Sequence, residues 1–485
     1  MGVIIAVVLI PANITFSSSI NAIKISHGIS PKSKILSSIV LNGINFFTIP
    51  IFTRLLGSEN YGRVSIYTTW ASFFTIIIGL QAGGSIATAK LKWNEKEMGH
   101  YYFNILMLMT ISFFVWFVSA LIGMKQICTL TGWEPFLIIL LLIHSFMAGC
   151  INVITLKNTY NKEAGTNFVI STIVSIASIL ISLILINKTI LFEERYIARI
   201  KGIAIVNILV GSFFYIKLIL AGKQRLNAQY IIYCLTFSIP LIFHGLSHII
   251  LGQSDRILIQ WYRTENEVGI YSLVYTFTGV LNIIWSALNN TWVPFYYEYE
   301  KNNEKNILIE KSKNYAMLFS VLVVGFILLS PEVMRMFVSD EFWGGIKLIP
   351  ILAISQFEIF LYSFPVNFQF YNHKTINIAI GTFGAACINI LLNIICIPIW
   401  GINGAAIATV CAYFALFVFH QCISCYFVKM KYVFNWKFFL KPVFLVLTGC
   451  IYYYVLFDYP LIRWGTGGLL GILIIKKIWH DKSIF

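Results

Sequence analysis

Residues 167–187 have the sequence NFVISTIVSIASILISLILIN, which contains no charged side chain. An α-helix needs about 20 apolar residues to cross the hydrocarbon core of a bilayer. This stretch has that length, and about thirteen similar ones share residues 35–478 with it, separated by short polar gaps. The apolar runs are continuous rather than alternating, which favours helices over an outer-membrane barrel. The sequence therefore predicts an all-α polytopic membrane protein.

The predicted spans leave little of the chain outside the membrane. No gap between them is large enough for a folded extramembrane domain. The span at 315–330 is short because Pro331 follows it, although it could continue through Val338. The spans are expected near residues 35–53, 64–88, 102–123, 136–156, 167–187, 202–220, 230–251, 269–292, 315–330, 346–370, 375–397, 402–428, 438–457 and 461–475.

The composition agrees with this interpretation. Of the 485 residues, 58% are hydrophobic and 11% are charged, and the mean hydropathy is +0.80. A soluble domain has about 25% charged residues, so water is not the main solvent of this chain. The net charge of +15 would suggest a nucleic-acid partner in a soluble protein. Here the basic residues concentrate on the side that would hold both termini, which predicts cytoplasmic termini, contact with anionic membrane lipids and no nucleic-acid partner.

A short motif occurs twice. Residues 57–62 (GSENYG) follow the first predicted span, and residues 263–269 (RTENEVG) follow the seventh. Two copies on the same side, six spans apart, are expected from two parallel six-helix repeats. The predicted division is residues 32–225 for helices 1–6, residues 226–430 for helices 7–12, and residues 431–485 for two additional helices with a cytoplasmic tail. Residues 1–31 do not belong to either repeat or to the additional helices, and we expect them to lie outside the fold.

Charged residues within the predicted spans are the first functional candidates. Ionised Glu358 facing lipid would cost about 3 kcal/mol, so it should face the bundle interior, where it is either a proton or cation site or a carboxyl bonded to a neighbouring helix. Asp255 and Arg256 lie near the outer end of the seventh span and point about 100° apart, so each should pair elsewhere. A structural ion pair is favoured for them. The functional alternative is that Arg256, with Arg54, binds a diphosphate or an anionic sugar.

Polar uncharged residues are the second group of candidates. His244 and His248 are four residues apart and share a helix face. No third ligand accompanies them, so helix packing or the lining of a polar cavity is favoured over a metal site. Amide side chains suit sugar hydroxyls, but they also bond helix to helix. No nucleotide-binding P-loop is present in the sequence, and neither a metal nor a cofactor is expected. The amides on the predicted substrate path are Asn42, Asn45, Gln81 and Asn282.

Four ordered motifs resemble those of bacterial polysaccharide flippases of the Wzx type, and the resemblance runs from about Lys32 to the C-terminus. The motifs are PIFTRLLGSENYG (50–62) with VSIY (64–67), QSDRILI (253–259) through VGIY (268–271), WVPFY (292–296), and LNIICIP (392–398) followed by GINGAAIAT (401–409). The resemblance implies membership of the multidrug/oligosaccharidyl-lipid/polysaccharide exporter superfamily. It also implies two six-helix lobes around a central cavity, with two further helices.

The implied function is that of a flippase of the bacterial inner membrane, not of an enzyme. Its cargo would be a polyprenyl-diphosphate-linked oligosaccharide for O-antigen (lipopolysaccharide), capsule or exopolysaccharide assembly. A polymerase and chain-length proteins of the same pathway are candidate partners. Arginines would hold the diphosphate, amides and histidines would line the path, and Asp255 or Glu358 would couple transport to an ion or form an ion pair. Two alternatives stay open: a cation-coupled exporter of small amphipathic compounds, and a membrane polymerase or glycosyltransferase, which would need a large outer loop.

Overall fold

The computed structural model describes residues 31–222, 226–427 and 432–480, and the side chains of residues 31–45 are not among those described. The predicted leader therefore lies almost entirely outside the described residues. Long helices account for nearly all of the rest. They are α2 (Pro31–Gly79), α3 (Ile86–Lys92), α4 (Glu95–Ile122), α5 (Met124–Thr131), α6 (Pro135–Tyr160), α7 (Ala164–Lys188), α8 (Arg195–Gly222), α9 (Ala228–Tyr262), α10 (Glu265–Lys301), α11 (Lys305–Phe337), α12 (Ile349–Tyr371), α13 (Thr375–Trp400), α14 (Ile402–Cys422), α15 (Trp436–Val455) and α16 (Pro460–His480).

Short non-α turns join some of these helices. They are the 3₁₀ segments η1 (Ala82–Ser85), η2 (Phe192–Glu194) and η3 (Asp340–Leu348), and the π segment η4 (Ile423–Phe427). A sharper break lies within α2, where Gly57 has φ 68° and ψ 176°. Residues with a side chain rarely adopt that backbone conformation, so Gly57 allows the chain to bend sharply there. α2 is therefore two successive helices, one on each side of Gly57.

The fold class is confirmed as all-α and polytopic. The described residues contain 11 helices long and apolar enough to cross a membrane, or 12 if the bent pair Phe46–Gly79 and Ala82–Lys92 is one span. The total of about fourteen membrane-spanning helices remains a prediction. Of the two interpretations of the span at 315–330, the longer one agrees with the structure, because α11 continues through Pro331 to Phe337. Pro331 and Ser330 are buried, and the Ser330 hydroxyl bonds to the Ile327 carbonyl at 2.8 Å.

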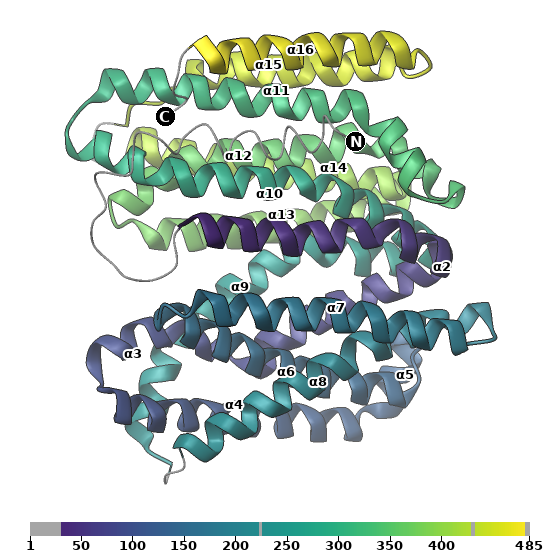
Figure 1. The fold of residues 1–485 in the computed structure, drawn as a ribbon, viewed down its shortest axis with the longest axis vertical. Coiled ribbons are helices and arrows are strands. Elements are labelled where there is room, and N and C mark those ends of the chain that lie inside the picture. The colour runs from purple at the N-terminus through teal and green to yellow at the C-terminus, as the bar shows by residue number, and fades with distance from the viewer. Residues whose placement is uncertain (1–30, 223–225, 428–431, 481–485) are drawn as a thin grey trace.

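The helices gather in two bundles (Figure 1). We call α3–α8 the N-terminal bundle and α10–α14 the C-terminal bundle. α2 and α9 each contact both. Separate hydrophobic cores fill the two bundles, one around Tyr101, Met109 and Phe146, the other around Phe319, Phe360 and Phe364. The lobe boundaries 32–225 and 226–430 remain a prediction.

α15 and α16 pack on α11 at the edge of the C-terminal bundle (Figure 1). Arg463 of α16 fixes their position. Its side chain is 1% exposed and pairs with Glu332 of α11 at 2.5 Å. The same guanidinium donates to the carbonyls of Leu328, Leu456 and Phe457. A buried charge with this many partners holds the hairpin in one position.

Replacing Arg463 with Ala should lower the stability of the folded protein by about 3 kcal/mol, because Glu332 would lose its partner in a partly buried position. Thermal unfolding of the detergent-solubilised protein measures the change. Arg335→Ala removes an exposed arginine from the same end of α11 and is the control. Equal melting temperatures for the two variants would contradict the assignment.

Candidate functional site

The two bundles meet through two glycines. Gly62 of α2 lies against α10, where a Cβ atom added to it would be 2.0 Å from the Glu265 carbonyl oxygen. Gly269 of α10 lies against α2, where an added Cβ would be 1.9 Å from the Ser58 carbonyl oxygen. Any side chain would separate these backbones. The glycines of the duplicated motif are therefore what lets the two helices touch.

Polar contacts reinforce this junction. Arg63 Nε lies 2.5 Å from Glu265 Oε2, and its Nη2 lies 2.7 Å from Glu59 Oε1. Glu341 of η3 accepts hydrogen bonds from the Ser58 amide at 2.8 Å and from its hydroxyl at 3.0 Å. We call this junction the end seal; it consists of Ser58, Gly62, Arg63, Glu265, Gly269 and Glu341. It joins the two bundles at the end of the molecule where the α9–α10 turn lies.

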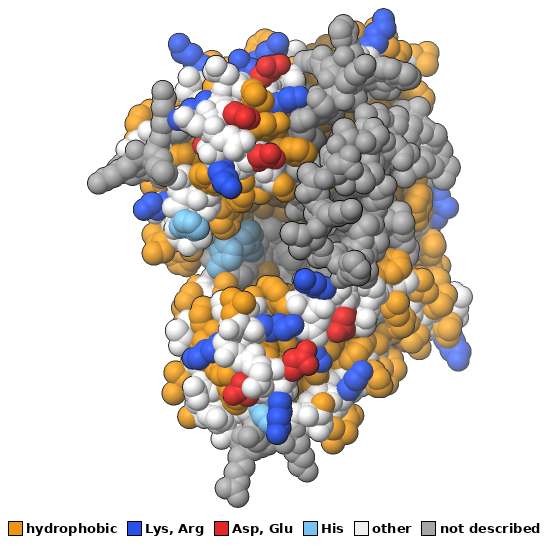
Figure 2. Space-filling view, turned by 60° about the vertical axis from the view of Figure 1, so that its left-hand side comes forward, with side chains coloured by type: hydrophobic (Ala, Val, Ile, Leu, Met, Phe, Trp, Pro, Cys, Tyr) orange, Lys and Arg blue, Asp and Glu red, His pale blue; other side chains and the backbone are white. Residues whose placement is uncertain are grey.

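The other end is open. Figure 2, in which that end is turned toward the viewer, shows a hollow between the two bundles with histidine side chains at its edge. A Cβ added to Gly245 would lie 2.6 Å from Gln81 Nε2, so the Gln81 amide touches the α9 backbone next to His244. Gln81 itself has the left-handed conformation (φ 48°) at the break between α2 and η1. The bundles are thus in direct contact at one end and separated by a hollow at the other.

The two arginines predicted to act together differ in their surroundings. Arg256 is half-buried, with its guanidinium over the Tyr275 ring at 5.1 Å, and Nε donates to Ser272 Oγ at 3.2 Å. Arg54 is exposed and forms no hydrogen bond or ion pair with a described residue.

Another arginine, Arg199 of α8, was missed by the sequence reasoning. Its guanidinium lies 3.8 Å from the centre of the Phe52 ring, and Nη1 donates to Ser182 Oγ at 2.8 Å. Arg199 therefore lies against Phe52 of α2, and Arg256 lies against Ser272 of α10, so each arginine contacts a helix that forms the end seal. The apolar run that predicts α8 begins at residue 202, which leaves Arg199 outside the predicted span. In the structure α8 already begins at Arg195, so Arg199 lies on the helix.

Asp255 is 1% exposed and forms no ion pair with a described residue. Three neutral groups donate to it: Asn393 Nδ2 at 2.7 Å, Thr409 Oγ1 at 2.7 Å, and the Tyr271 hydroxyl. The partners come from α10, α13 and α14, so this carboxylate connects four helices. The sequence favoured a structural ion pair for Asp255, and these contacts with neutral donors differ from that prediction. Arg256 instead points to Ser272 and Tyr275.

The Asp255 site is rich in oxygen ligands. Asn389 Oδ1 accepts from Asn393 and from Ser254, each at 3.1 Å, while Thr409 Oγ1 also lies 3.0 Å from the Ala405 carbonyl. The Asn389 amide nitrogen and the Asn393 oxygen are buried without a partner among the described residues. Carboxylate, amide, hydroxyl and carbonyl oxygens suit a proton or a hard cation. The sequence signal for Asn389 and Asn393 was their four-residue spacing within an apolar helix.

Glu358 of α12 is 6% exposed, and its Oε2 has no hydrogen-bond partner among the described residues. Gln356 Oε1 is likewise buried and unpartnered. A carboxyl bonded to a neighbouring helix was one of the two sequence interpretations, and no described residue supplies that bond. Glu358 is therefore a second buried carboxyl in this part of the molecule and, unlike Asp255, has no described hydrogen-bond donor.

The remaining candidates lie apart from these groups. The rings of His244 and His248 are 4.7 Å apart and perpendicular, and no group of three or more potential His, Cys, Asp or Glu metal ligands occurs in the described chain. Asn282 is half-buried on α10. The side chains of Asn42 and Asn45 lie outside those described.

Comparisons with known proteins agree on the family. The polysaccharide biosynthesis protein family matches residues 33–300. Lsg locus putative protein 1 of Haemophilus influenzae is 25% identical over 346 residues, which cover 68% of this chain and 81% of that protein. The succinoglycan biosynthesis transport protein ExoT of Rhizobium meliloti is 20% identical over 336 residues, which cover 66% of this chain and 64% of that protein.

Solved structures share the fold. The lipid II flippase MurJ in an inward closed conformation superposes with a TM-score of 0.72 at 17% identity, covering 93% of this chain and 99% of that one. An inward-facing multidrug resistance MATE family transporter of the MOP superfamily gives a TM-score of 0.61 at 14% identity, covering 80% and 98%. The chain is therefore a multi-pass membrane protein that shares the fold of these transporters, and it belongs to the polysaccharide biosynthesis protein family.

Proposed function

We propose that this protein is a flippase that moves a polyprenyl-diphosphate-linked oligosaccharide from the cytoplasmic to the periplasmic leaflet of the bacterial inner membrane. The observation that carries the proposal is a hollow between the two bundles at the end opposite the end seal, with Arg199 and Arg256 on the helices that form the seal or contact it. Family membership and the named role of ExoT in succinoglycan biosynthesis support a polysaccharide precursor as the cargo class.

The physics of the cargo fits this geometry. A diphosphate-linked sugar head cannot cross hydrocarbon at a useful rate, because its charge and hydrogen bonds would be unmet. A hydrated passage supplies polar partners for the head while the polyprenyl tail stays in the lipid. Guanidinium groups bind phosphate oxygens in a bidentate geometry, so Arg199 and Arg256 are suited to the diphosphate. His244, His248, Gln81 and Asn282 offer partners for sugar hydroxyls.

The orientation follows from the charge pattern. Basic residues such as Lys90, Lys92 and Lys301 lie at the opposite helix ends from the end seal, so the positive-inside rule makes that side cytoplasmic. In this proposal the hollow opens toward the cytoplasm and the end seal lies on the periplasmic side. An even number of spans, such as fourteen, places both termini on the same side, which this orientation makes cytoplasmic.

Asp255 is our first candidate for ion coupling. Its carboxylate holds α9, α10, α13 and α14 together, so a proton or cation that replaced one of its donors would change how these helices pack. Glu358 is the second candidate. Two buried carboxyls also favour the alternative function, export of small amphipathic cations; a deletion strain with altered drug susceptibility and normal polymer display would support it instead.

Replacing Arg256 or Arg199 with Ala should lower polymer display by about tenfold, because each removes a charge-assisted contact to the diphosphate. Display is measured by immunoblotting of the surface polysaccharide at matched protein levels, together with the lipid-linked sugars that accumulate. Arg54→Ala should cause a smaller loss, since its guanidinium is exposed. Arg335→Ala is the control. Wild-type display in both Arg256→Ala and Arg199→Ala would refute the assignment.

The Asp255→Asn substitution keeps the shape of the side chain but removes its charge, so we expect transport to lose its dependence on the proton or sodium gradient. The measurement is cargo translocation in proteoliposomes with each gradient imposed separately. Asp458→Asn, at an exposed position, serves as the control. Undiminished gradient dependence in Asp255→Asn would transfer the role to Glu358, which Glu358→Gln tests in the same assay.

Gly62→Ala should weaken the end seal, because the added methyl group meets the Glu265 carbonyl. A cysteine at Thr276, an exposed α10 position near Tyr61, should then react faster with a membrane-impermeant maleimide added from the periplasmic side. Gly279→Ala on the same helix is a matched control, since no atom lies within 4 Å of its added Cβ. Identical labelling rates in the two variants would rule out the seal.

A further inference from the structure

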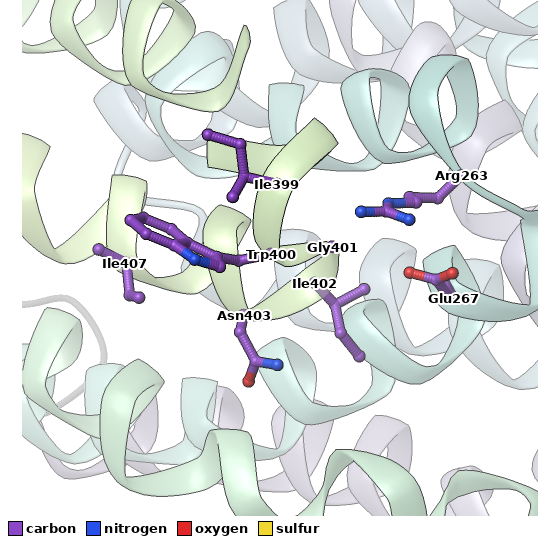
Figure 3. A pocket seen from close by; sticks show the side chains of 8 residues that line it. All are labelled: Arg263, Glu267, Ile399, Trp400, Gly401, Ile402, Asn403 and Ile407. Atoms are coloured by element: carbon purple, nitrogen blue, oxygen red, sulfur yellow. The ribbon is translucent and has the colours of Figure 1, made fainter. Parts of the chain in front are cut away.

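A cavity of about 550 Å³ lies at the turn between α13 and α14 (Figure 3). No residue that we assign to the transport path lines it. Its wall combines the α9–α10 turn with the end of α13 and the start of α14. The lining residues are Arg263, Glu267, Ile399, Trp400, Gly401, Ile402, Asn403 and Ile407.

The cavity contains one cation and one carboxylate that do not pair with each other. Arg263 is fixed by the end of α13, where its Nη2 donates to the Pro398 carbonyl at 2.7 Å and to the Ile397 carbonyl at 3.1 Å. Glu267 is half-buried, and its carboxylate accepts no hydrogen bond from a described residue. Gly401 (φ +57°) lets the turn pass close by, since an added Cβ would lie 3.2 Å from Glu267 Oε2. Figure 3 shows both charged side chains directed toward this turn.

The opposite rim of the cavity is apolar. Trp400 is 53% exposed, and Ile399 and Ile407 are also exposed, on the same two helices as exposed Leu391 and Ile395. A surface of this composition on membrane-spanning helices faces lipid, and tryptophan is enriched where the hydrocarbon meets the headgroups. The cavity therefore lies at headgroup level, with its charges on the protein side and its apolar rim toward the acyl chains.

We propose that this cavity binds the headgroup of a zwitterionic phospholipid that carries a primary ammonium group, such as phosphatidylethanolamine. The phosphate lies beside Arg263, the ammonium group donates to Glu267, and the first part of the acyl chains contacts Ile399, Trp400 and Ile407. The cavity is shallow and open on one side, which suits a headgroup whose acyl chains stay in the lipid. An anionic lipid would leave Glu267 without a partner, and a choline headgroup has no N–H to donate to it.

Native mass spectrometry of the full-length protein, delipidated in detergent, tests the proposal. Phosphatidylethanolamine, phosphatidylglycerol and phosphatidylcholine with identical acyl chains are added separately. The wild type should retain phosphatidylethanolamine preferentially. Glu267→Gln should lower that retention by about tenfold, because a charge-assisted hydrogen bond is lost, and should leave phosphatidylglycerol unchanged. Trp400→Ala should reduce retention of all three lipids.

The matched control is Glu310→Gln, which neutralises an exposed carboxylate near the start of α11. Retention like that of the wild type in this variant, with loss in Glu267→Gln, supports the proposal. Equal retention of the three lipids by the wild type, equal behaviour of the two glutamate variants, or undiminished binding by Trp400→Ala would overturn it. Binding of a free oligosaccharide that requires Glu267, without any lipid preference, would overturn it in favour of a sugar site.

Discussion

The hydrocarbon core of a bilayer offers no water to donate or accept a hydrogen bond, so backbone and side-chain polar groups must find partners within the protein. That constraint explains the long helices, and it also explains where the polar side chains lie. Asp255 is enclosed by donors from three other helices, and Arg463 by a carboxylate and several carbonyls. Where a polar group is left without a described partner, as with Glu358 Oε2, the cost of burial makes a functional role the simplest explanation.

The two ends of the passage are built differently. At the end seal the backbones of α2 and α10 touch at Gly62 and Gly269, and ionic contacts involving Arg63 and Glu341 surround them. Large side chains also meet beside this junction, where Ile66 of α2 belongs to one hydrophobic core with Val268 of α10 and Phe342 of η3, so opening it would require this core to repack. The other end is held less closely, with the Gln81 amide against the α9 backbone beside the hollow. This asymmetry is what a single state of an alternating-access cycle requires.

The polar network of the C-terminal bundle and Arg256 are adjacent in sequence, because Asp255 and Arg256 are consecutive residues of α9. They face different partners: Asp255 contacts α13 and α14, and Arg256 contacts Ser272 and Tyr275 of α10. α9 also crosses from one bundle to the other. A change in the occupancy of the Asp255 site would therefore act on the same helix that positions Arg256. If the proposed function is correct, this helix is a physical route by which an ion gradient could drive movement of an anionic headgroup.

Local sequence properties determined much of the fold of this protein. The length and continuity of the apolar runs determined the helical membrane fold, and the cost of charge in hydrocarbon predicted that Glu358 is buried within the bundle. The tertiary structure alone decided which side chains meet. Arg199 lies against Phe52 while Arg54 is exposed, Asp255 binds Asn393 and Thr409 rather than an arginine, and the duplicated glycines touch. Periodicity records which face of a helix is apolar, but contacts between residues more than a hundred positions apart depend on how whole helices pack.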